Sequence, residues 1–434
     1  MIARSDPPTR TRIAAEPETA RLVADTITRL LDRINAISAG GPGWTRPSYS
    51  ALESQAHRVI EEEALALGLT VSRDAAGNFL ARMDGQDPSR PPLFIGSHLD
   101  TVSQGGAYDG QAGVAAALAL IAALSARRIT PPMDLVLIIT RAEESVWFPV
   151  SYIGSRAHLG RLLSEDLTAL RSDTGRSLSD HMRDEGGDPA AVLAMAPPPP
   201  AQFLEFHIEQ GPVLAAAGEA YGLVTAVRGG LRYRQARITG QWAHSGGAPR
   251  GARADAVVAF CDLVMAMDRI WAELLAQGDD LTVTFGRVDA ATPAHAMAKV
   301  AGDLGFCVDL RSENVEVLDR ADTLLKSELA RIEAERPGIA FALGTQSRSA
   351  PARMSGDVLA RIERGAAALA DQPRRMLSGG GHDAAAFASA GWDSAMIFIR
   401  NENGSHCPEE HMEIADLTRA TLAVLAAIAG GWDA

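Results

Sequence analysis

The sequence predicts an α/β protein with a second, α+β domain inserted into the first. Apolar strands and Ala-rich helices alternate as far as about Leu223, which is the pattern of a sheet covered by helices. Beyond this point the order of elements changes, and from about Ala350 the first pattern resumes. We therefore expect a polar tail over 1–20 and a discontinuous first domain over 21–223 and 350–434. The inserted domain is expected over 224–349.

The first strands and helices of this pattern end or begin at polar side chains. The apolar run Leu93-Phe94-Ile95 leads to His98 and Asp100, and the apolar run from Val114 to Leu124 predicts a helix that begins just after Asp109. A carboxylate at a helix start also meets favourable helix-dipole charge. Because a strand end and a helix start can meet across one cleft, we expect these polar side chains to converge.

A second buried strand is predicted within Asp134 to Ser145, DLVLIITRAEES, and it ends in the adjacent carboxylates Glu143 and Glu144. Neighbouring strand residues face opposite ways, so one carboxylate can ligate a metal while the other acts on water. The segment EFHIEQGP places His207 on a strand, and NGSHCPEE places His406 in a turn. Imidazole and carboxylate are the ligand types that hold zinc or manganese. Each residue alone also fits a structural or solvated role.

The inserted domain is predicted from elements in the order βαββαβ, which is typical of a ferredoxin-like sandwich. Strands are expected over 231–242, 281–289, 303–311 and 339–347, and helices over 252–277 and 316–336. In the first domain, the Ala- and Pro-rich stretch from Pro189 to Ala201 predicts a surface connection.

Composition favours a globular, soluble enzyme and disfavours several other classes. The chain has 434 residues, 47% of them hydrophobic, and its apolar runs are shorter than the roughly 18 residues of a membrane span. A net charge of −13 argues against a nucleic-acid surface. Two lysines, Lys299 and Lys326, and no GxxxxGK[ST] motif disfavour Schiff-base and phosphate-cofactor chemistry. Three widely spaced cysteines and a polar N-terminal tail predict no disulfide framework and a cytoplasmic location.

In this order, the polar segments resemble the two-metal aminoacylase and carboxypeptidase-like metallohydrolases. Within these they resemble the hydantoinase/carbamoylase amidases, which include N-carbamoyl-L-amino acid hydrolases, allantoate amidohydrolases and beta-ureidopropionases. The resemblance runs from DAAGN, Asp74 to Asn78, through to His406. It implies a phosphorylase/hydrolase-like metal domain with a mixed sheet and helices on both faces. It also implies two divalent ions per subunit (Zn, Mn, Co or Ni), and a homodimer formed through the inserted lid and dimerisation domain.

The resemblance also implies roles for the metal-site residues. Asp109 becomes the carboxylate that bridges two ions, Glu143 the general base, and Asp100 the carboxylate that orients His98. The terminal ligands implied are His98, Glu144, His207 and His406.

Three further segments resemble substrate-contacting motifs. The run AHSGGAPRGARAD, with His244, Arg253 and Asp255, resembles HAGTTPMxxRxD, whose His stabilises the substrate oxyanion; a His that only closes a Gly-rich turn is the alternative. In GFCVDLRS, Arg311 matches an Arg that grips a substrate carboxylate, although a surface salt bridge fits as well. GGGHDAAAF resembles the pocket loop GAGHDA. The implied substrate-binding residues are Gln210, His244, Arg311, Gly381 and His382.

Departures from the family pattern concern the residues around the ligands. An Asn of relatives is Ala298 here, TTPM is replaced by Gly247-Ala248-Pro249-Arg250, and Trp147 stands in the EEGxRF segment, where it either forms a pocket wall or packs in the core. The expected activity is hydrolysis of a linear amide C–N bond, with an N-carbamoyl group on a small amino-acid-like carboxylate as substrate. An N-acyl amino acid deacylase, a dipeptidase, an aminohydrolase and, remotely, a non-catalytic small-molecule binding protein are the alternatives. No nucleic-acid or membrane partner is expected.

Overall fold

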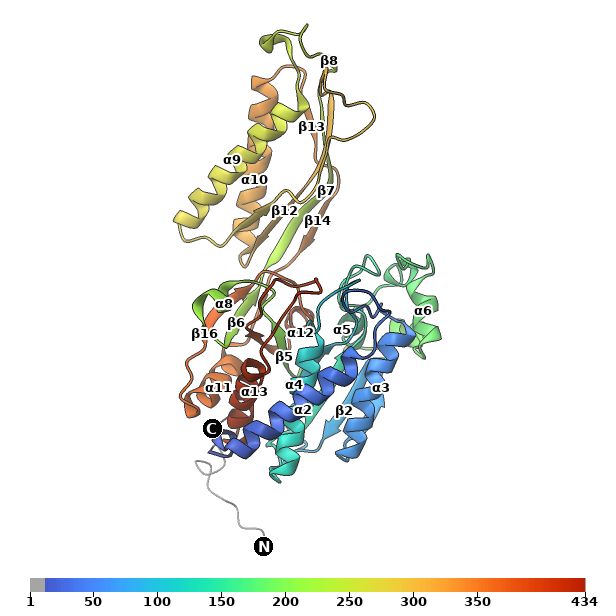
Figure 1. Ribbon diagram of the computed structural model, residues 1–434, viewed down its shortest axis with the longest axis vertical. Helices are drawn as coiled ribbons and strands as arrows, with labels where there is room; N and C mark the ends of the chain where they lie inside the picture. Colours follow the sequence, from blue (N-terminus) through green and yellow to red (C-terminus); the bar gives the residue numbers. More distant parts are fainter. Residues whose placement is uncertain (1–11, 434) are drawn as a thin grey trace. The chain divides into compact units, whose positions relative to one another are not determined.

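Residues 12–433 are described in the computed structural model, and they fold as two compact units (Figure 1). Unit 1 contains the described residues of Met1–Thr225 and Arg353–Ala434, and unit 2 contains Ala226–Ala352. Unit 2 is thus inserted between two segments that fold together. No helix within 12–433 has both the length and the apolar composition needed to cross a bilayer.

A mixed β-sheet forms the centre of unit 1, with the strand order β1-β2-β4-β3-β5-β17-β6-β15, and β16 also pairs with β6. β4, β3, β5 and β17 are parallel neighbours, so their carboxyl ends lie at one edge of the sheet. β1, β2 and β6 join antiparallel. The strands are β1 Thr70–Arg73, β2 Phe79–Met83, β3 Leu93–His98, β4 Leu135–Thr140, β5 Gln202–Ile208, β6 Tyr221–Val227, β15 Ala352–Arg353, β16 Arg374–Ser378 and β17 Asp393–Ile399.

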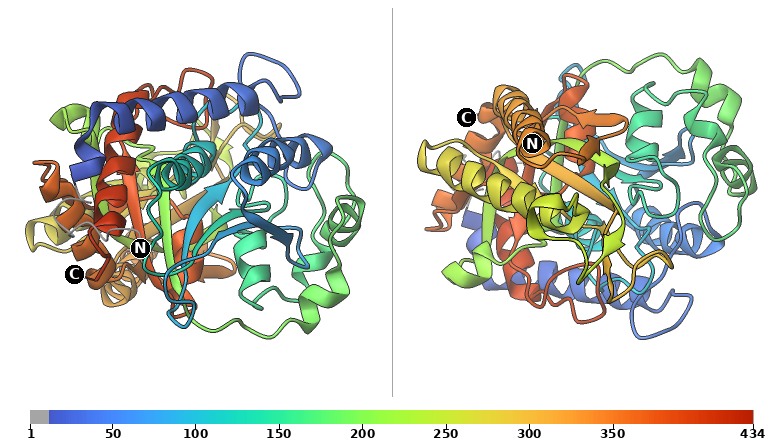
Figure 2. Two further views of the ribbon diagram at one scale, coloured as in Figure 1. Left: turned by 90° about the horizontal axis from the view of Figure 1, so that it is seen from below. Right: turned by 90° about the horizontal axis from the view of Figure 1, so that it is seen from above.

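Helices cover both faces of this sheet, which confirms the predicted α/β class. α4 and α13 lie against one face, and α12 with α5 lies against the other (Figure 2). α4 is buried on nearly all sides because Ala, Leu, Val and Ile occupy most of its positions. The helices are η1 Arg12–Ala15, α2 Pro17–Asn35, α3 Ala51–Ala66, α4 Gln111–Ala126, α5 Ile153–His158, η2 Asp166–Thr168, α6 Leu178–Asp184, α7 Pro189–Ala194, α8 Val213–Ala217, α11 Gly356–Ala368, α12 Asp383–Ser389 and α13 Ile414–Ala429.

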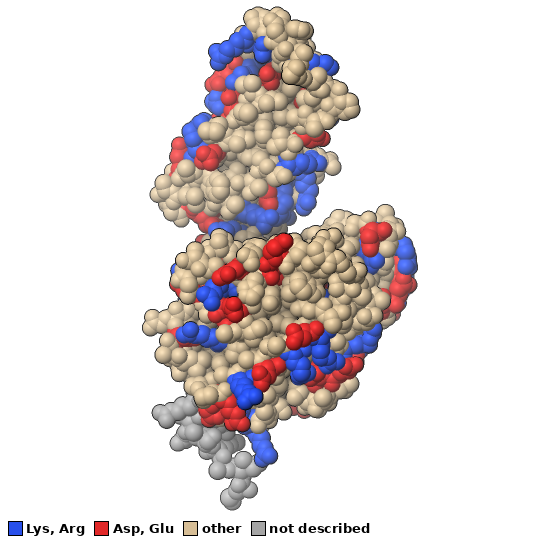
Figure 3. Space-filling view, in the orientation of Figure 1, with Lys and Arg blue, Asp and Glu red and all other residues tan. Residues whose placement is uncertain are grey.

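The surface of unit 1 carries interspersed basic and acidic side chains (Figure 3). On α2 and α3, Arg33 pairs with Glu62 and Glu63 at 2.6 and 2.5 Å. Exposed pairs of this kind contribute about 0–1 kcal/mol each. The stability of unit 1 therefore depends mainly on its apolar interior, in which β3, β4, β5 and β17 are almost entirely buried.

Unit 2 is an antiparallel sheet with α9 and α10 packed on one face. The long strands β7 and β12 pair at its centre, β13 and β14 pair with β7, β9 and β10 pair with β12, and β8 forms a separate pair with β11. Every second residue of β12 is buried, so the other face lies open within the unit. The elements are β7 Gly229–Thr239, β8 Ala243–His244, η3 Arg250–Ala252, α9 Ala256–Ala276, β9 Thr282–Thr284, β10 Val288–Asp289, β11 Lys299–Val300, β12 Asp303–Ser312, α10 Val315–Glu335, β13 Ala340–Ala342 and β14 Gln346–Ser349.

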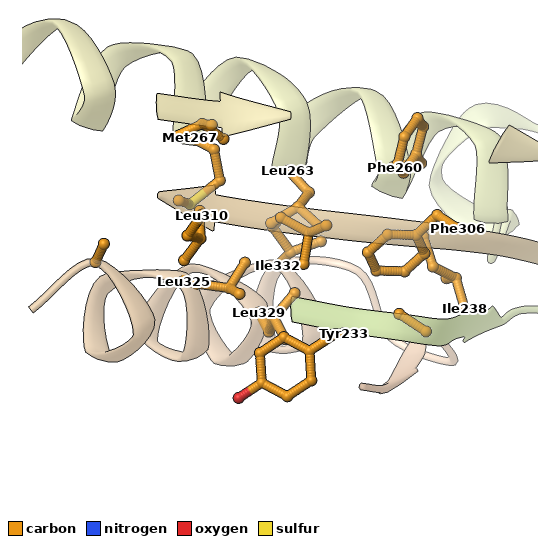
Figure 4. Packing of buried hydrophobic residues seen from close by; sticks show 14 of the residues in the cluster. Tyr233, Ile238, Phe260, Leu263, Met267, Phe306, Leu310, Leu325, Leu329 and Ile332 are labelled. Carbon is orange, nitrogen blue, oxygen red and sulfur yellow. The ribbon is translucent and has the colours of Figure 1, made fainter. Parts of the chain in front are cut away.

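The core of unit 2 lies between the two helices and the sheet. Apolar side chains from α9, α10, β7 and β12 meet there, and they include Ile238, Leu263, Met267, Phe306, Leu310, Leu325 and Ile332 (Figure 4). The hydroxyl of Tyr233 donates to Asp322 at 2.8 Å, so the polar end of this buried ring has a partner. Unit 2 thus has an interior of its own.

Two strands of unit 2 differ from the sequence prediction. The strand expected over 281–289 is divided into β9 and β10, which pair with separate parts of β12 on either side of the point, between Phe306 and Val308, where the register of β12 with β7 shifts. The strand expected over 339–347 is divided into β13 and β14, and Gly344 lies between them with a φ of +72°. In both cases a local irregularity interrupts the pairing.

Two segments of unit 1 also differ from the prediction. Of the polar tail expected over 1–20, residues 1–11 lie outside the described part, but α2 already begins at Pro17, since proline suits a first helical turn. The connection expected from Pro189 to Ala201 is wrong in its first half, where α7 forms. Asp188 caps this helix by accepting from Ala190 N and Ala191 N.

Candidate metal centre

The predicted metal ligands of unit 1 come together at the carboxyl edge of the parallel strands. His98 is the last residue of β3, His207 lies near the end of β5, Glu144 follows β4 and His406 follows β17. Asp109 lies between β3 and α4, where Gly110 caps the helix. Ligand sites in open α/β sheets commonly lie at this edge.

Asp109 is at the centre of the group. Its Oδ1 lies 3.5 Å from His98 Nε2 and 3.3 Å from His207 Nε2. Its Oδ2 lies 3.4 Å from His406 Nε2, which is also 3.5 Å from Glu144 Oε1. Two sets of three ligands therefore share Asp109, and the ligand atoms of each set lie within 4.8 Å of one another. One carboxylate with different imidazoles at its two oxygens suits the binding of two neighbouring cations.

The ring orientations of two histidines favour metal binding. Nδ1 of His98 lies 3.0 Å from the carbonyl oxygen of Asp100, and Nδ1 of His207 lies 2.9 Å from that of Ile208. A carbonyl oxygen only accepts, so each Nδ1 carries the hydrogen in the neutral ring. The lone pair of each Nε2 is then directed toward Asp109. This is the tautomer that a metal ligand requires.

Asp100, the residue expected to orient His98, contacts both halves of the site. Its carbonyl oxygen is the nearer partner of His98 Nδ1, and its Oδ1 lies 3.4 Å from the same nitrogen. The carboxylate also accepts from Glu143 N and Glu144 N, both at 3.2 Å. Asp100 therefore connects the end of β3 with the loop that follows β4.

Glu143 and Glu144 do not lie on a strand, so the alternation argument for them is wrong. β4 ends at Thr140, and the following loop passes through Ala142 at a φ of +54°. The two side chains nevertheless diverge: Glu143 Oε2 lies 3.9 Å from His98 Nε2, whereas Glu144 faces His406. The loop, rather than the pleat of a strand, separates their positions.

The carboxyl groups of the site have strongly shifted pKa values. Burial raises the pKa of Asp109, but the imidazoles of His207, His406 and His98 outweigh this effect and hold it well below its usual range. Burial raises the pKa of Glu144 to about 7, and the charge of Asp109 adds to the rise. Burial also raises the pKa of Glu143 well above its usual range. A carboxyl group so shifted is suited to exchanging a proton near neutral pH.

Gln210 and the Gly379–His382 loop lie next to the ligands. Gln210 Nε2 donates to Asp109 Oδ2 at 2.7 Å. The ring of His382 is buried 4.4 Å from that of His207, and its Nε2 has no partner within the described residues. Burial lowers the pKa of His382 well below its usual range, so the ring is neutral. A Cβ on Gly381 would lie 1.6 Å from the Tyr152 hydroxyl, so only glycine fits there.

Two acidic residues of the site, Glu410 and Glu205, were not singled out from the sequence. Glu410 accepts from Asp109 N at 3.1 Å and from Ser405 Oγ at 2.7 Å, and thereby joins the loops of Asp109 and His406. Glu205 lies two residues before His207, on the same face of β5, and forms a possible three-ligand set with His207 and His382. The sequence EFHIE could have indicated Glu205, because residues two positions apart on a strand face the same side. Trp147, by contrast, packs in the core of unit 1, and its indole donates to Thr101 O.

His244 lies in unit 2, in an exposed turn. Its Nδ1 accepts from Gly246 N at 3.2 Å and from Gly247 N at 3.0 Å. The ring hydrogen of the neutral imidazole is therefore on Nε2. Arg253 donates through Nε to Ala248 O and through a terminal nitrogen to Ser245 O, so it secures the same turn. The His244 ring closes the Gly-rich turn, as the alternative interpretation of the sequence expected. Its Nε2–H can still donate to another group.

Arg311 lies on β12 of unit 2. It donates through Nε and Nη2 to Asp309 Oδ2 at 3.0 and 2.8 Å, and Arg232 Nε lies 3.1 Å from the other oxygen of this carboxylate. Asp255 caps α9 by accepting from Val257 N and Val258 N. Ala298, where relatives carry an Asn, contributes a carbonyl oxygen that accepts from Ser245 N. The contacts given for these residues of unit 2 are thus with other residues of the same unit.

Comparisons with known proteins agree on one family. Residues 94–430 match peptidase family M20/M25/M40. The chain is 30% identical to an N-carbamoyl-L-amino-acid amidohydrolase of Paenarthrobacter aurescens over 93% of this chain and 96% of that protein. It is 31% identical to the allantoate amidohydrolase of Escherichia coli K12, covering 91% and 94% of the two. A hydantoinase/carbamoylase family amidase from Burkholderia ambifaria has a similar crystal structure, with a TM-score of 0.83, 30% identity and coverage of 94% and 97%.

Proposed function

Because the chain belongs to peptidase family M20/M25/M40, and within it to the hydantoinase/carbamoylase amidases, we propose that it hydrolyses the N-carbamoyl group of a small amino-acid-like carboxylate. It is a hydrolase of non-peptide C–N bonds. The observation that carries the proposal is the pair of ligand sets that share Asp109, with Glu143 beside them. The names of the relatives, which act on carbamoyl amino acids and allantoate, support the ureido substrate class.

We assign the cofactor as two divalent ions, zinc, manganese, cobalt or nickel. His98, His207 and Asp109 would hold one ion, and Asp109, Glu144 and His406 the other. Imidazole and carboxylate ligands suit all of these metals. When bound, ions of this kind would polarise a carbonyl group and lower the pKa of water toward neutral pH.

Glu143 is the residue that moves the proton. Its carboxyl group lies beside the ligands without belonging to either set, and burial raises its pKa well above the usual range. It would accept a proton from the attacking water and return it to the leaving nitrogen. The carbamoyl C–N bond then breaks to give an amine and carbamic acid, which decomposes to carbon dioxide and ammonia.

Five residues are assigned to substrate binding on the family resemblance. His244 would donate from Nε2 to the oxyanion that forms at the carbonyl, since its Nδ1 is occupied by backbone N–H groups. Arg311 would bind the substrate carboxylate. Gln210, Gly381 and His382 would form the wall next to the ligands, in keeping with the contact of Gln210 with Asp109.

We also propose a homodimer formed through unit 2, the inserted domain expected to act as lid and dimerisation surface. The exposed side of α9 carries Val257, Val258, Met265 and Leu275. Burying such residues against a second copy would be favourable. Light scattering should give a dimer mass, and Met265→Arg should lower it to that of a monomer if α9 forms the interface.

Three free cysteines fit the proposed cytoplasmic location, which cell fractionation tests.

The proposed activity is tested with metal-stripped protein reloaded separately with Mn, Zn and Co. Ammonia and amine release are measured on N-carbamoyl, N-acyl, ureido and dipeptide substrates, with Glu143→Gln as the inactive control. Metal-dependent turnover of a carbamoyl acid that Glu143→Gln abolishes supports the proposal. Turnover confined to acyl or dipeptide substrates would assign the chain to a deacylase or dipeptidase, and ligand binding without turnover would indicate a binding protein.

A further inference from the structure

Side chains supply the acceptors for the backbone amides of the loop that carries Glu143 and Glu144, while the carbonyl oxygens of residues 141–143 accept from the amides of residues 152–154. Residues 141–144 belong to no helix or strand, and buried backbone N–H groups need acceptors. Each of the four consecutive amides donates to a side-chain oxygen. The pairs are Arg141 N to Asn78 Oδ1 at 2.8 Å, Ala142 N to Glu53 Oε1 at 3.1 Å, and Glu143 N and Glu144 N to Asp100 Oδ1 and Oδ2 at 3.2 Å.

The acceptor Glu53 is itself fixed from several directions. Its side chain is fully buried in the first turn of α3. Besides the Ala142 amide, it accepts from Tyr49 N at 2.7 Å and from Arg141 Nη1 at 2.8 Å. Arg141 also donates to Ser54 Oγ on the same helix. Glu53 therefore joins α3 to both the backbone and the side chain at the start of the loop.

Asn78 joins the two ends of a longer loop. Its Oδ1 accepts from Arg141 N, while its Nδ2 donates to Gly154 O at 2.9 Å. Asp74 fixes Asn78 by accepting from its backbone N and its side-chain amide. The intervening Gly77 has a φ of +82°, which explains the glycine of the DAAGN segment. A Cβ on Gly154 would lie 2.5 Å from Asn78 Oδ1, so the fit is close.

We propose that Glu53 and Asn78 are positioning residues that, together with Asp100, set the positions of Glu143 and Glu144. The inference rests on the proposed function, because it assigns the proton transfer to Glu143 and a metal contact to Glu144. Neither Glu53 nor Asn78 touches the ligand sets. Both act through the backbone of residues 141 and 142, which directly precede the two glutamates.

Small displacements of this loop have large consequences for the reaction. A misplacement of about 1 Å at a reacting group can cost about 10²-fold in rate. Losing the acceptor for Ala142 N would also leave a buried donor unpaired, so the backbone would move toward another partner. Since Ala142 already has a left-handed conformation, its alternative is the common right-handed or extended one. Either change would redirect the carboxylate of Glu143.

Hydrogen exchange of the wild-type protein is the first test, read by mass spectrometry at single-residue resolution. The amides of 141–144 should exchange about as slowly as those of β4, although they lie outside secondary structure. Exchange at the rate of an open loop would overturn the proposal, and this result needs no variant to fold.

Asn78→Ala and Glu53→Ala form the second test, with Asp188→Ala as the matched control. Asp188 also accepts two backbone amides in unit 1, and the hydrogen bonds of its carboxylate are made within the start of α7, to Ala190 N and Ala191 N. Both test variants should show faster exchange confined to 141–144, a kcat lowered by about 10–100-fold, and a KM changed by less than about 3-fold. The control should keep the wild-type kcat. Wild-type kcat in folded test variants, or faster exchange spread evenly over unit 1, would overturn the proposal.

A second variant at Asn78 and a measurement of metal affinity separate a change in the position of the loop from a loss of the fold. If Asn78→Ala fails to fold, Asn78→Asp keeps the acceptor for Arg141 N but loses the donors to Gly154 O and to Asp74 Oδ2 and places a second carboxyl group beside Asp74, so exchange should increase at 74–78 and at the far end of the loop. Metal affinity, measured by isothermal titration with Mn, should fall in the test variants because Glu144 moves. If wild-type protein turns over no carbamoyl substrate, the proposed function fails, while exchange and metal affinity still decide whether Glu53 and Asn78 position the loop.

Discussion

The metal ligands of unit 1 and the His244 turn of unit 2 are held in contrasting ways. Asp109 is buried and has His98, His207, His406 and Gln210 around its two oxygens. His244 is exposed, and its only recorded side-chain contacts within the described residues are with the amides of its own turn. One group is assembled from the ends of several buried strands, whereas the His244 ring is held by two amides of its own turn, and the backbone of that turn pairs with residues 298–300.

This difference indicates what each region needs in order to act. The buried imidazoles of His98 and His207, whose Nδ1 atoms face carbonyl oxygens, and the carboxylate of Asp109 form an arrangement that suits cations. The His244 turn has a fixed tautomer but no enclosing contacts in its own unit, so its contribution depends on substrate or a further surface. Changes at the candidate ligands of unit 1 should therefore affect metal content and chemistry together, whereas changes at His244 should affect chemistry alone.

Asp109→Asn should have the largest effect. An amide cannot supply two anionic oxygens to two sets of ligands, so one ion should be lost and activity should fall below detection. Metal content by plasma mass spectrometry should decrease in the same protein. Ser405→Ala, which removes a hydroxyl that donates to Asp109 Oδ2, is the control and should keep both ions. Full metal content in Asp109→Asn would contradict the bridging role.

Glu143→Gln should separate chemistry from metal binding within unit 1. The glutaminyl amide cannot accept a proton, so kcat should fall by roughly 10²–10⁴-fold while metal content stays at the wild-type level. A parallel loss of metal would show that Glu143 is a ligand instead. Stopped-assay kinetics and metal analysis on one preparation distinguish the two outcomes.

His244→Ala should affect chemistry without affecting the metal. Losing one donor to an oxyanion typically lowers kcat by about 10²–10³-fold. His295→Ala is a matched control, since His295 is in the same unit and contacts Thr292 and the backbone of Asp303. If both variants keep wild-type kcat, His244 serves only to close its turn.

Asp255→Ala should have the smallest effect, confined to the stability of unit 2. It removes the side-chain cap from α9, which should lower the free energy of unfolding by about 1 kcal/mol. Hydrogen exchange should increase at the start of α9 and stay unchanged at β3 and β4. Equal increases in both units would show that the two unfold as one.

Elements with continuous or regular apolar patterns were predictable from the sequence. The runs that became β3, β4 and α4 are buried almost throughout, so their composition alone distinguishes them from loops. The left-handed conformation of Ala142 was not predictable, because alanine has no preference for it and the acceptors of the amides at 141 and 142, Asn78 and Glu53, lie far away in the sequence. For the same reason the strand was extended too far, to Glu143 and Glu144.

Proximity between distant ligands came from the resemblance and not from local pattern. Nothing in the chain near His406 indicates that its ring lies 3.4 Å from Asp109, almost three hundred positions earlier. The contacts of Glu410 and Gln210 with the Asp109 region likewise depend on the assembled sheet. Local sequence specifies the strand ends that carry polar residues, and the parallel order of β4, β3, β5 and β17 brings them together.

The most direct test of the bridging arrangement is anomalous X-ray diffraction from crystals of protein loaded with manganese or zinc. Two peaks about 3.5–4 Å apart are expected, one beside each carboxylate oxygen of Asp109. His98 and His207 should contact the first ion, and Glu144 and His406 the second. A single peak, or peaks whose ligands exclude Asp109, would contradict the account.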